Sequence, residues 1–157
     1  MDALSAPLIA RDDPARPEVA AVIEAHLAQM RAQTPADMVF ALPLAALQAA
    51  DILFYSLTLE QVVGVGAIRL LGGGVAEIKS MHVRAEFRGR GLGAALVVHL
   101  IAEARARGVL ALYLETGAGA AHASARRLYA RLGFADCGPF GDYEPDERSA
   151  FMVLPLV

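Results

Sequence analysis

The apolar residues change their spacing twice along the chain, and this change constrains the fold more than any other feature. Three segments rich in β-branched and aromatic residues follow one another across short turns, at residues 52–57, 62–70 and 75–83. Such a row predicts three antiparallel strands joined by tight connections. From Leu92 onward the apolar residues recur at three and four positions, which predicts a helix that Gly108 ends.

The flanking segments complete one mixed unit of strands and helices. The stretch 109–114 is almost wholly apolar, as is typical of a central strand covered on both faces, and with the preceding strand and helix it forms a βαβ unit. The other expected helices span residues 17–33, 44–50 and 121–132, and the other expected strands 8–10 and 150–156. These elements predict an α+β, or mixed α/β, class around one mostly antiparallel sheet.

Size and charge exclude several classes of function. The chain has 157 residues and a net charge of −3, so we expect one domain, residues 1–157, without general electrostatic binding to nucleic acid or to an anionic membrane. The first four residues carry no basic segment of a secretory signal, so we expect a cytoplasmic protein. The single cysteine, Cys137, excludes an internal disulfide and a cysteine-rich metal site. No metal ligand set is predicted, and the oligomeric state is left open, a homodimer included.

A glycine-rich basic loop carries the main chemical signal of the sequence. Gly89, Gly91 and Gly93 stand between the strand that ends at Val83 and the helix that begins at Leu92. Glycines let the backbone come close to a ligand, and the start of a helix presents free N–H groups with partial positive charge. The loop therefore suits a phosphate or pyrophosphate, although a turn with solvated arginines would have the same spacing. Neither the P-loop nor the dinucleotide-binding glycine pattern is present.

Three motifs in order resemble the GNAT superfamily of acyl-CoA-dependent N-acetyltransferases. The run Arg88-Gly89-Arg90-Gly91-Leu92-Gly93 satisfies the signature of that family: Arg or Gln, two residues, Gly, one residue, then Gly or Ala. Residues 77–83 resemble the fourth strand of the family, and residues 124–134 its A-x-x-L-Y-x-x-x-G-F helix. The tail, at 137–143 and 149–152, further resembles a subgroup of small bacterial members that includes the YsnE-like proteins.

This resemblance implies a fold and an activity. The implied fold is a GNAT fold: a central, mostly antiparallel sheet of about six to seven strands with a splayed parallel pair at its centre, flanked by about four helices. The implied activity moves an acetyl group from acetyl-CoA, in a ternary complex, to the primary amine of a small molecule or an amino-acid-like substrate, with CoA as the product. Two alternatives remain: an acyl-CoA-binding sensor or scaffold without turnover, and a protein or peptide N-acetyltransferase.

The resemblance also implies how the chain holds acetyl-CoA. The backbone amides of the glycine loop would hold the pyrophosphate, with two arginines as supporting charges. The main chain at the end of the preceding strand would pair with the pantetheine arm, and a bulge there would direct an amide at the thioester carbonyl. The residues implied in cofactor binding are Met81, His82, Val83, Arg88, Gly89, Arg90, Gly91, Leu92, Gly93 and Ala94.

Tyr129 is the residue implied as proton donor to the departing CoA thiolate. The helical period places it at the edge of an inward stripe formed by Ala121, Ala125, Leu128 and Leu132, so its ring would pack while its hydroxyl reaches a cleft. The simpler alternative is a tyrosine that only completes the core.

Glu77 is the residue implied as the base, because it stands eleven residues before Arg88, as the base of the histone-acetylating branch does. On a regularly alternating strand it would share a face with Lys79 and Met81. One alternative is that Glu77 is a solvated carboxylate paired with Lys79 and has no catalytic role. Another is that Glu115 or solvent acts as the base. His122 stands where many relatives carry Asn, so the cofactor contact made by that Asn is not carried over.

Overall fold

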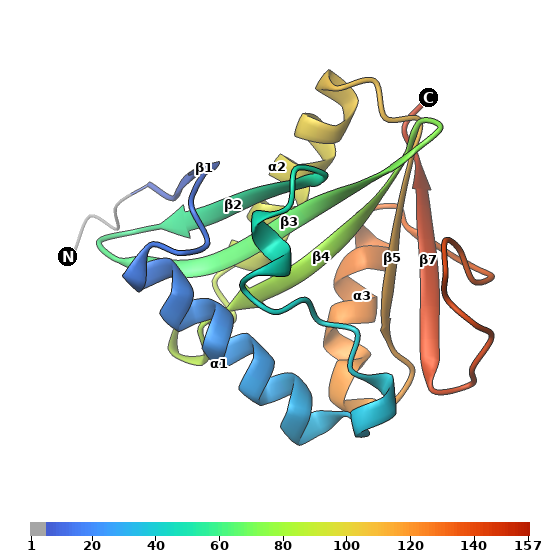
Figure 1. Ribbon diagram of the computed structural model, residues 1–157, viewed down its shortest axis with the longest axis horizontal. Coiled ribbons are helices and arrows are strands. Elements are labelled where there is room, and N and C mark those ends of the chain that lie inside the picture. Colours follow the sequence, from blue (N-terminus) through green and yellow to red (C-terminus); the bar gives the residue numbers. More distant parts are fainter. Residues whose placement is uncertain (1–5) are drawn as a thin grey trace.

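A seven-stranded sheet in the order β1-β2-β3-β4-β5-β7-β6 forms the centre of the computed structural model, which describes residues 6–157 (Figure 1). Its strands are β1 (Leu8–Arg11), β2 (Ile52–Thr58), β3 (Val62–Gly72), β4 (Val75–Val83), β5 (Ala111–Gly117), β6 (Ala135–Cys137) and β7 (Ser149–Pro155). The α-helices are α1 (Pro17–Gln33), α2 (Leu92–Ala106) and α3 (Ala123–Arg131).

Neighbouring strands are antiparallel except for the central pair, β4 and β5, which is parallel. The register of this parallel pair runs only from Val75 opposite Ala111 to Glu77 opposite Tyr113. Beyond Glu77 the two strands separate. The predicted mixed fold, with a mostly antiparallel sheet and a splayed parallel pair, is therefore confirmed.

Helix α1 covers one face of the sheet, and α2 and α3 cover the other. Successive strand residues point to alternate faces, so each strand contributes side chains to both. Figure 1 shows α1 in front of the sheet and α2 behind it. Val22 and Ile23 of α1 pack with Phe54 in one hydrophobic cluster. The neighbouring β2 residues Leu53 and Tyr55 pack in another cluster, with residues of α2 and α3. The face covered by α1 and the face covered by α2 and α3 thus have separate cores.

Some boundaries differ from the sequence expectations. The segment after Pro43 forms only a single 3-10 turn, Ala46–Gln48, in which Leu47 is the buried residue, while Leu44 packs against the same cluster from outside the turn. The last helix begins at Ala123, after a 3-10 turn, and Ala121, expected to face inward, is exposed. In the described residues, no helix has both the length and the apolar character that crossing a membrane requires.

A small polar network ties the start of α1 to the sheet. Arg16, the residue before the helix, donates to the carboxylate of Asp12 at 2.6 and 3.0 Å. The hydroxyl of the buried Ser56 on β2 donates to the same carboxylate at 2.5 Å. These bonds lower the pKa of Asp12 from 3.8 to about 2, with the bond from Arg16 as the largest cause.

Replacing Asp12 by Asn should therefore destabilise the fold in a pH-dependent way. A carboxyl group whose pKa falls on folding stabilises the native state above its unfolded pKa, and this contribution is lost as the pH falls from about 4 toward about 2. At pH 7 we expect Asp12→Asn to lower the free energy of unfolding by about 1 to 3 kcal/mol, measured by urea denaturation. The loss should shrink near pH 2.5, and the exposed Asp142→Asn should show neither effect; an equal loss at both pH values would contradict the assignment.

Candidate active site

A cleft of about 1140 Å³ opens where β4 and β5 separate. Its walls come from the ends of both strands, one side of α1, the segment after α1, the glycine loop, the first turn of α2, and one side of α3. The cleft therefore passes from the α2 and α3 face of the sheet to the α1 face. It brings together segments that are more than a hundred residues apart in the sequence.

A bulge in β4 shapes this cleft. Ser80 adopts a left-handed backbone conformation with φ of 57°, and the register with β3 skips a residue between Lys79 and His82. The extra residue shifts the alternation of the strand. Met81 consequently packs with residues of the α2 face, while the ring of His82 lies 5.2 Å from that of His26 on α1. The expectation that Glu77 shares a face with Lys79 is correct, but the expectation for Met81 is wrong.

The glycine loop leaves room for a ligand at the start of α2. Gly89 and Gly91 have φ of 79° and 78°, and a Cβ atom at either position would meet no protein atom within 4 Å. The first hydrogen bond of the helix runs from the Ala95 N–H to the Gly91 carbonyl, so the amides of residues 92–94 precede the helical ladder. The first turn holds no acidic side chain. Exposed amides beside open space are what a phosphate group requires.

The two arginines of this loop have different surroundings. Arg88 donates to the Val83 carbonyl at 2.8 Å and to the side chain of Gln29 on α1 at 2.6 Å. Arg90 is exposed, and its guanidinium lies 5.2 Å from the centre of the Phe87 ring. Arg88 thus links the loop to α1, a contact that the sequence did not indicate.

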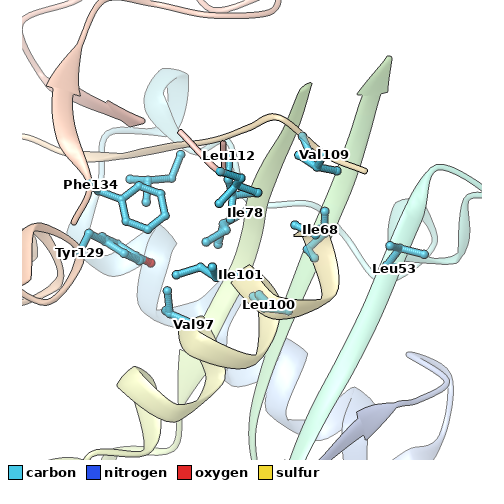
Figure 2. Close-up of a cluster of buried hydrophobic side chains, with 14 of the residues drawn as sticks. Leu53, Ile68, Ile78, Val97, Leu100, Ile101, Val109, Leu112, Tyr129 and Phe134 are labelled. Atoms are coloured by element: carbon cyan, nitrogen blue, oxygen red, sulfur yellow. The ribbon is translucent and has the colours of Figure 1, made fainter. Parts of the chain in front are cut away.

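Tyr129 is the one buried residue of α3 and also lines the cleft. Its ring packs edge to face against Phe134, with 5.7 Å between the ring centres. Figure 2 shows its hydroxyl pointing toward Val97 and Ile101 of α2. Burial raises the pKa of Tyr129 to about 12. The tyrosine therefore lies deeper than the edge position that the sequence predicted, but it packs in the core and lines a cleft as expected, and it carries its proton at neutral pH.

Glu77 lies in a buried polar cluster on the α1 face. Its carboxylate accepts a hydrogen bond from the Tyr143 hydroxyl at 2.5 Å and lies 3.3 Å from the ammonium of Lys79. Lys79 also donates to Tyr143 at 2.9 Å and to the Phe40 carbonyl at 3.2 Å. With 3% of its surface exposed, Glu77 is not the solvated carboxylate of the simpler sequence interpretation. Lys79 lines the cleft, whereas Glu77 lies behind it.

Glu115, the competing carboxylate, lines the cleft directly from β5. It is half-buried, and the Ser149 hydroxyl donates to it at 2.8 Å. Burial raises the pKa of Glu115, and the bond from Ser149 opposes this rise only in part. Glu115 lies on the same face of the sheet as Glu77, since Leu112 and Leu114 occupy the opposite core.

Two further histidine features became visible only in three dimensions. His122 stands just before α3, and its ring leaves no room for a Cβ atom at Gly117, the last residue of β5. His26 and His82 are both buried in the wall of the cleft. The helical period around His26 could have shown that it faces inward, but no sequence signal joins it to His82.

These features, a split parallel pair, a bulged strand and a glycine loop that opens a helix, define an acyltransferase of the GNAT type. Residues 19–134 match the model of the acetyltransferase (GNAT) family, and the chain belongs to this family. It is therefore an acyltransferase enzyme that uses an acyl-CoA donor.

The comparisons also confirm the subgroup that the tail of the sequence resembles. The uncharacterized N-acetyltransferase YsnE of Bacillus subtilis is 36% identical over 146 residues, which cover 92% of this chain and 97% of that protein. The IAA acetyltransferase of Azospirillum brasilense is 41% identical over 150 residues, 94% and 97% of the two chains. A Klebsiella pneumoniae structure described as an acyl-CoA N-acyltransferase has a TM-score of 0.79 and 31% identity, over 96% of this chain and 98% of that one.

Gly93 offers a direct test of the glycine loop. A Cβ atom there would make an ordinary contact with Leu128 at 3.5 Å, whereas a substitution at Gly91 would add backbone strain. Gly93→Val should fold and place methyl groups beside the amides of the loop. Calorimetry should then show the affinity for acetyl-CoA reduced at least about tenfold, roughly 1.4 kcal/mol. Ala102→Val, at an exposed position of the same helix, is the control. A folded Gly93→Val protein that binds acetyl-CoA with normal affinity would exclude the glycine loop as the acetyl-CoA site.

Proposed function

We propose that this enzyme transfers an acetyl group from acetyl-CoA to the primary amine of a small molecule, by direct attack in a ternary complex. The observation that carries this proposal is that one cleft spans both faces of the sheet. The glycine loop and Tyr129 belong to the α2 and α3 side, whereas Glu115 and the two buried histidines belong to the α1 side. The two substrates would then meet in the gap between β4 and β5.

The chain would bind acetyl-CoA mainly through its backbone. The amides from Gly89 to Ala94 would hold the pyrophosphate at the start of α2. Past Glu77, the edge of β4 that faces β5 pairs with no strand of residues 6–157, so Met81, His82 and Val83 would pair with the amides of the pantetheine arm as a strand does. Arg90 would add charge at the surface, while Arg88 would act by holding the loop against α1.

The bulge at Ser80 would stabilise the developing negative charge. A bulge removes a residue from the ladder and turns its backbone groups away from the neighbouring strand. An amide freed in this way lies beside the gap, where the thioester carbonyl would lie, and would donate to its oxygen as the amine attacks. The nitrogen–carbon bond forms, the carbon–sulfur bond breaks, and sulfur leaves with the electron pair.

Tyr129 would then donate its proton to this sulfur. Within residues 6–157 its hydroxyl has no hydrogen-bond partner, and burial keeps it protonated at neutral pH, so it has a proton to give when the thiolate leaves. The proton lost by the amine would go to a carboxylate on the other face. Position supports Glu115, which lines the cleft; Glu77 would act only through Tyr143 or Lys79, and its role stays a prediction of the sequence.

Release of CoA thiol tests this proposal against a sensor or scaffold that binds acyl-CoA without turnover. A panel of amines, amino acids, polyamines and peptides with free N-termini should contain acceptors that release thiol from acetyl-CoA and yield the acetylated amine by mass spectrometry. Tight binding of acetyl-CoA without product from any acceptor would support the sensor. Product from peptides alone would instead support a peptide N-acetyltransferase.

Tyr129→Phe should separate catalysis from packing. The phenyl ring keeps the contact with Phe134 but has no proton to give, so turnover should fall about 10²- to 10⁴-fold under conditions where chemistry limits the rate. The melting temperature and the affinity for acetyl-CoA should hardly change. Tyr55→Phe is a matched control, because the Tyr55 hydroxyl donates to Glu103 on α2 and Tyr55 does not line the cleft. Near-normal turnover of Tyr129→Phe would make the residue structural.

Glu115→Gln and Glu77→Gln should identify the proton acceptor. A carboxylate base works only when deprotonated, so kcat/KM should fall as the pH drops through its pKa, which burial raises for Glu115. We expect Glu115→Gln to remove this acid limb and leave acetyl-CoA affinity unchanged. A limb that only Glu77→Gln removes would assign the base to Glu77, and an unchanged limb in both variants would assign it to solvent.

A further inference from the structure

The wall of the cleft on the α1 side is polar but holds two closely spaced neutral rings. His26 and His82 are each 7% exposed, and their ring centres lie 5.2 Å apart at an interplanar angle of 60°. Thr34, at the end of α1, and Ser80, at the bulge, lie in the same wall. No metal site accounts for the pair, because within the described chain no three His, Cys, Asp or Glu side chains cluster closely enough to hold an ion.

Several polar atoms of this wall lack partners. Nδ1 of His26, Oγ1 of Thr34 and Oγ of Ser80 are enclosed, and among residues 6–157 none of them has a hydrogen-bond partner. Neither ring nitrogen of His82 is bonded to another part of the described chain. A buried polar group without a partner costs about 1 to 3 kcal/mol, so a ligand that forms hydrogen bonds with this wall would offset part of that cost.

The two imidazoles of this wall carry no charge at neutral pH. Burial, together with the nearby charges of Arg88 and Lys79, lowers the pKa of His26 to about 4. Burial, His26 and Arg88 lower the pKa of His82 to about 4 as well. Both imidazoles are therefore neutral above about pH 5 and offer a nitrogen lone pair.

The cations on the α1 side of the cleft are already engaged, whereas Arg131, which also lines the cleft, belongs to the end of α3. Lys79 is paired with Glu77, and Arg88 donates to Val83 and Gln29. At the rim, Arg148 is held between Asp37 at 3.0 Å and Asp146 at 2.8 Å. A carboxylate on the acceptor would need an uncommitted cation, since a buried anion without one is costly. Glu115, in contrast, accepts a hydrogen bond from the Ser149 hydroxyl, and its carboxyl group forms no ion pair among the described residues.

We propose that the acceptor is a primary amine that carries no carboxylate, and that the imidazoles of His26 and His82 accept hydrogen bonds from its amino group. This inference rests on the proposed function. His82 follows Ser80 by two residues, so an amine bonded to its ring lies next to the site assigned to the thioester carbonyl. Neutral imidazoles accept from an N–H without competing for its proton, which leaves proton removal to Glu115.

Matched acceptor pairs test the substrate class. Tyramine and tyrosine, histamine and histidine, and phenethylamine and phenylalanine differ within each pair only by the carboxylate. The kcat/KM of thiol release should favour the carboxylate-free member by at least about tenfold in the pairs that react, which corresponds to roughly 1.4 kcal/mol. An equal or higher value for the amino acids would overturn the inference while leaving the proposed function intact.

Absence of turnover with every compound would count against the proposed function. The relative affinity for the amine and for its amino acid would then test the inference about the acceptor. Calorimetry with the protein saturated with CoA should show the amine bound at least about tenfold more tightly than its amino acid. Equal or tighter binding of the amino acid would overturn the inference.

Two variants test the residues themselves. His26→Phe keeps a ring of similar size but removes both nitrogens, so the KM for the amine should rise at least about tenfold while the KM for acetyl-CoA stays within about twofold. His99→Phe is the control, since His99 lies on α2 beside Glu103 and outside the cleft. An effect of His26→Phe no larger than that of His99→Phe would overturn the role of the pair.

Thr34→Arg keeps the test decisive if His26→Phe does not fold. It places a new cation in the same wall at a half-buried position. The ratio of kcat/KM for the carboxylate-free amine to kcat/KM for its amino acid should fall by at least about tenfold. An unchanged preference in a folded Thr34→Arg protein would show that the charge of this wall does not select the acceptor.

Discussion

The separation of β4 and β5 after Glu77 is the constraint on which the rest of the site depends. Two neighbouring parallel strands that stop pairing leave backbone N–H and C=O groups without partners, and folded proteins rarely bury such groups unsatisfied. The left-handed Ser80 adds to this break, because it interrupts the register with β3 as well. The cleft is therefore a gap in the hydrogen-bond ladder of the sheet, and it suits a ligand that supplies backbone-like amides.

Because the gap passes through the sheet, it separates the two proton transfers of the proposed reaction. Tyr129 belongs to the core under α2 and α3, where burial favours the protonated phenol. Glu115 lies on the opposite face, where it has a hydroxyl partner and touches the cleft. A buried acid and a half-buried base on opposite faces do not neutralise each other directly, so each is available to a substrate that enters from its own side.

Local spacing predicted much of this arrangement, and longer-range packing explains the parts it missed. The strands, the glycine loop and the helix after it follow from period and turn residues within short windows. The face of Met81 was wrong because one left-handed residue shifts the alternation, and no pattern marks Ser80 as that residue. Tyr143 was missed as the partner of Glu77 because it stands 66 residues away, in a loop without periodicity. Tyr129 lies deeper than its helical stripe suggests, because Phe134 packs on it from beyond the helix.

The cluster of Glu77, Lys79 and Tyr143 has a structural role on the α1 side of the cleft, which Lys79 lines. A buried ion pair adds little net stability, because desolvation offsets the attraction, but losing either partner leaves an uncompensated charge. Lys79 reaches the Phe40 carbonyl, and Tyr143 packs edge to face on the Phe40 ring. Lys79 and Tyr143 therefore hold the loop after α1 and the loop before β7 against β4. Since Phe40 lines the cleft together with Lys79, this charge cluster helps to determine the shape of the cleft on the α1 side.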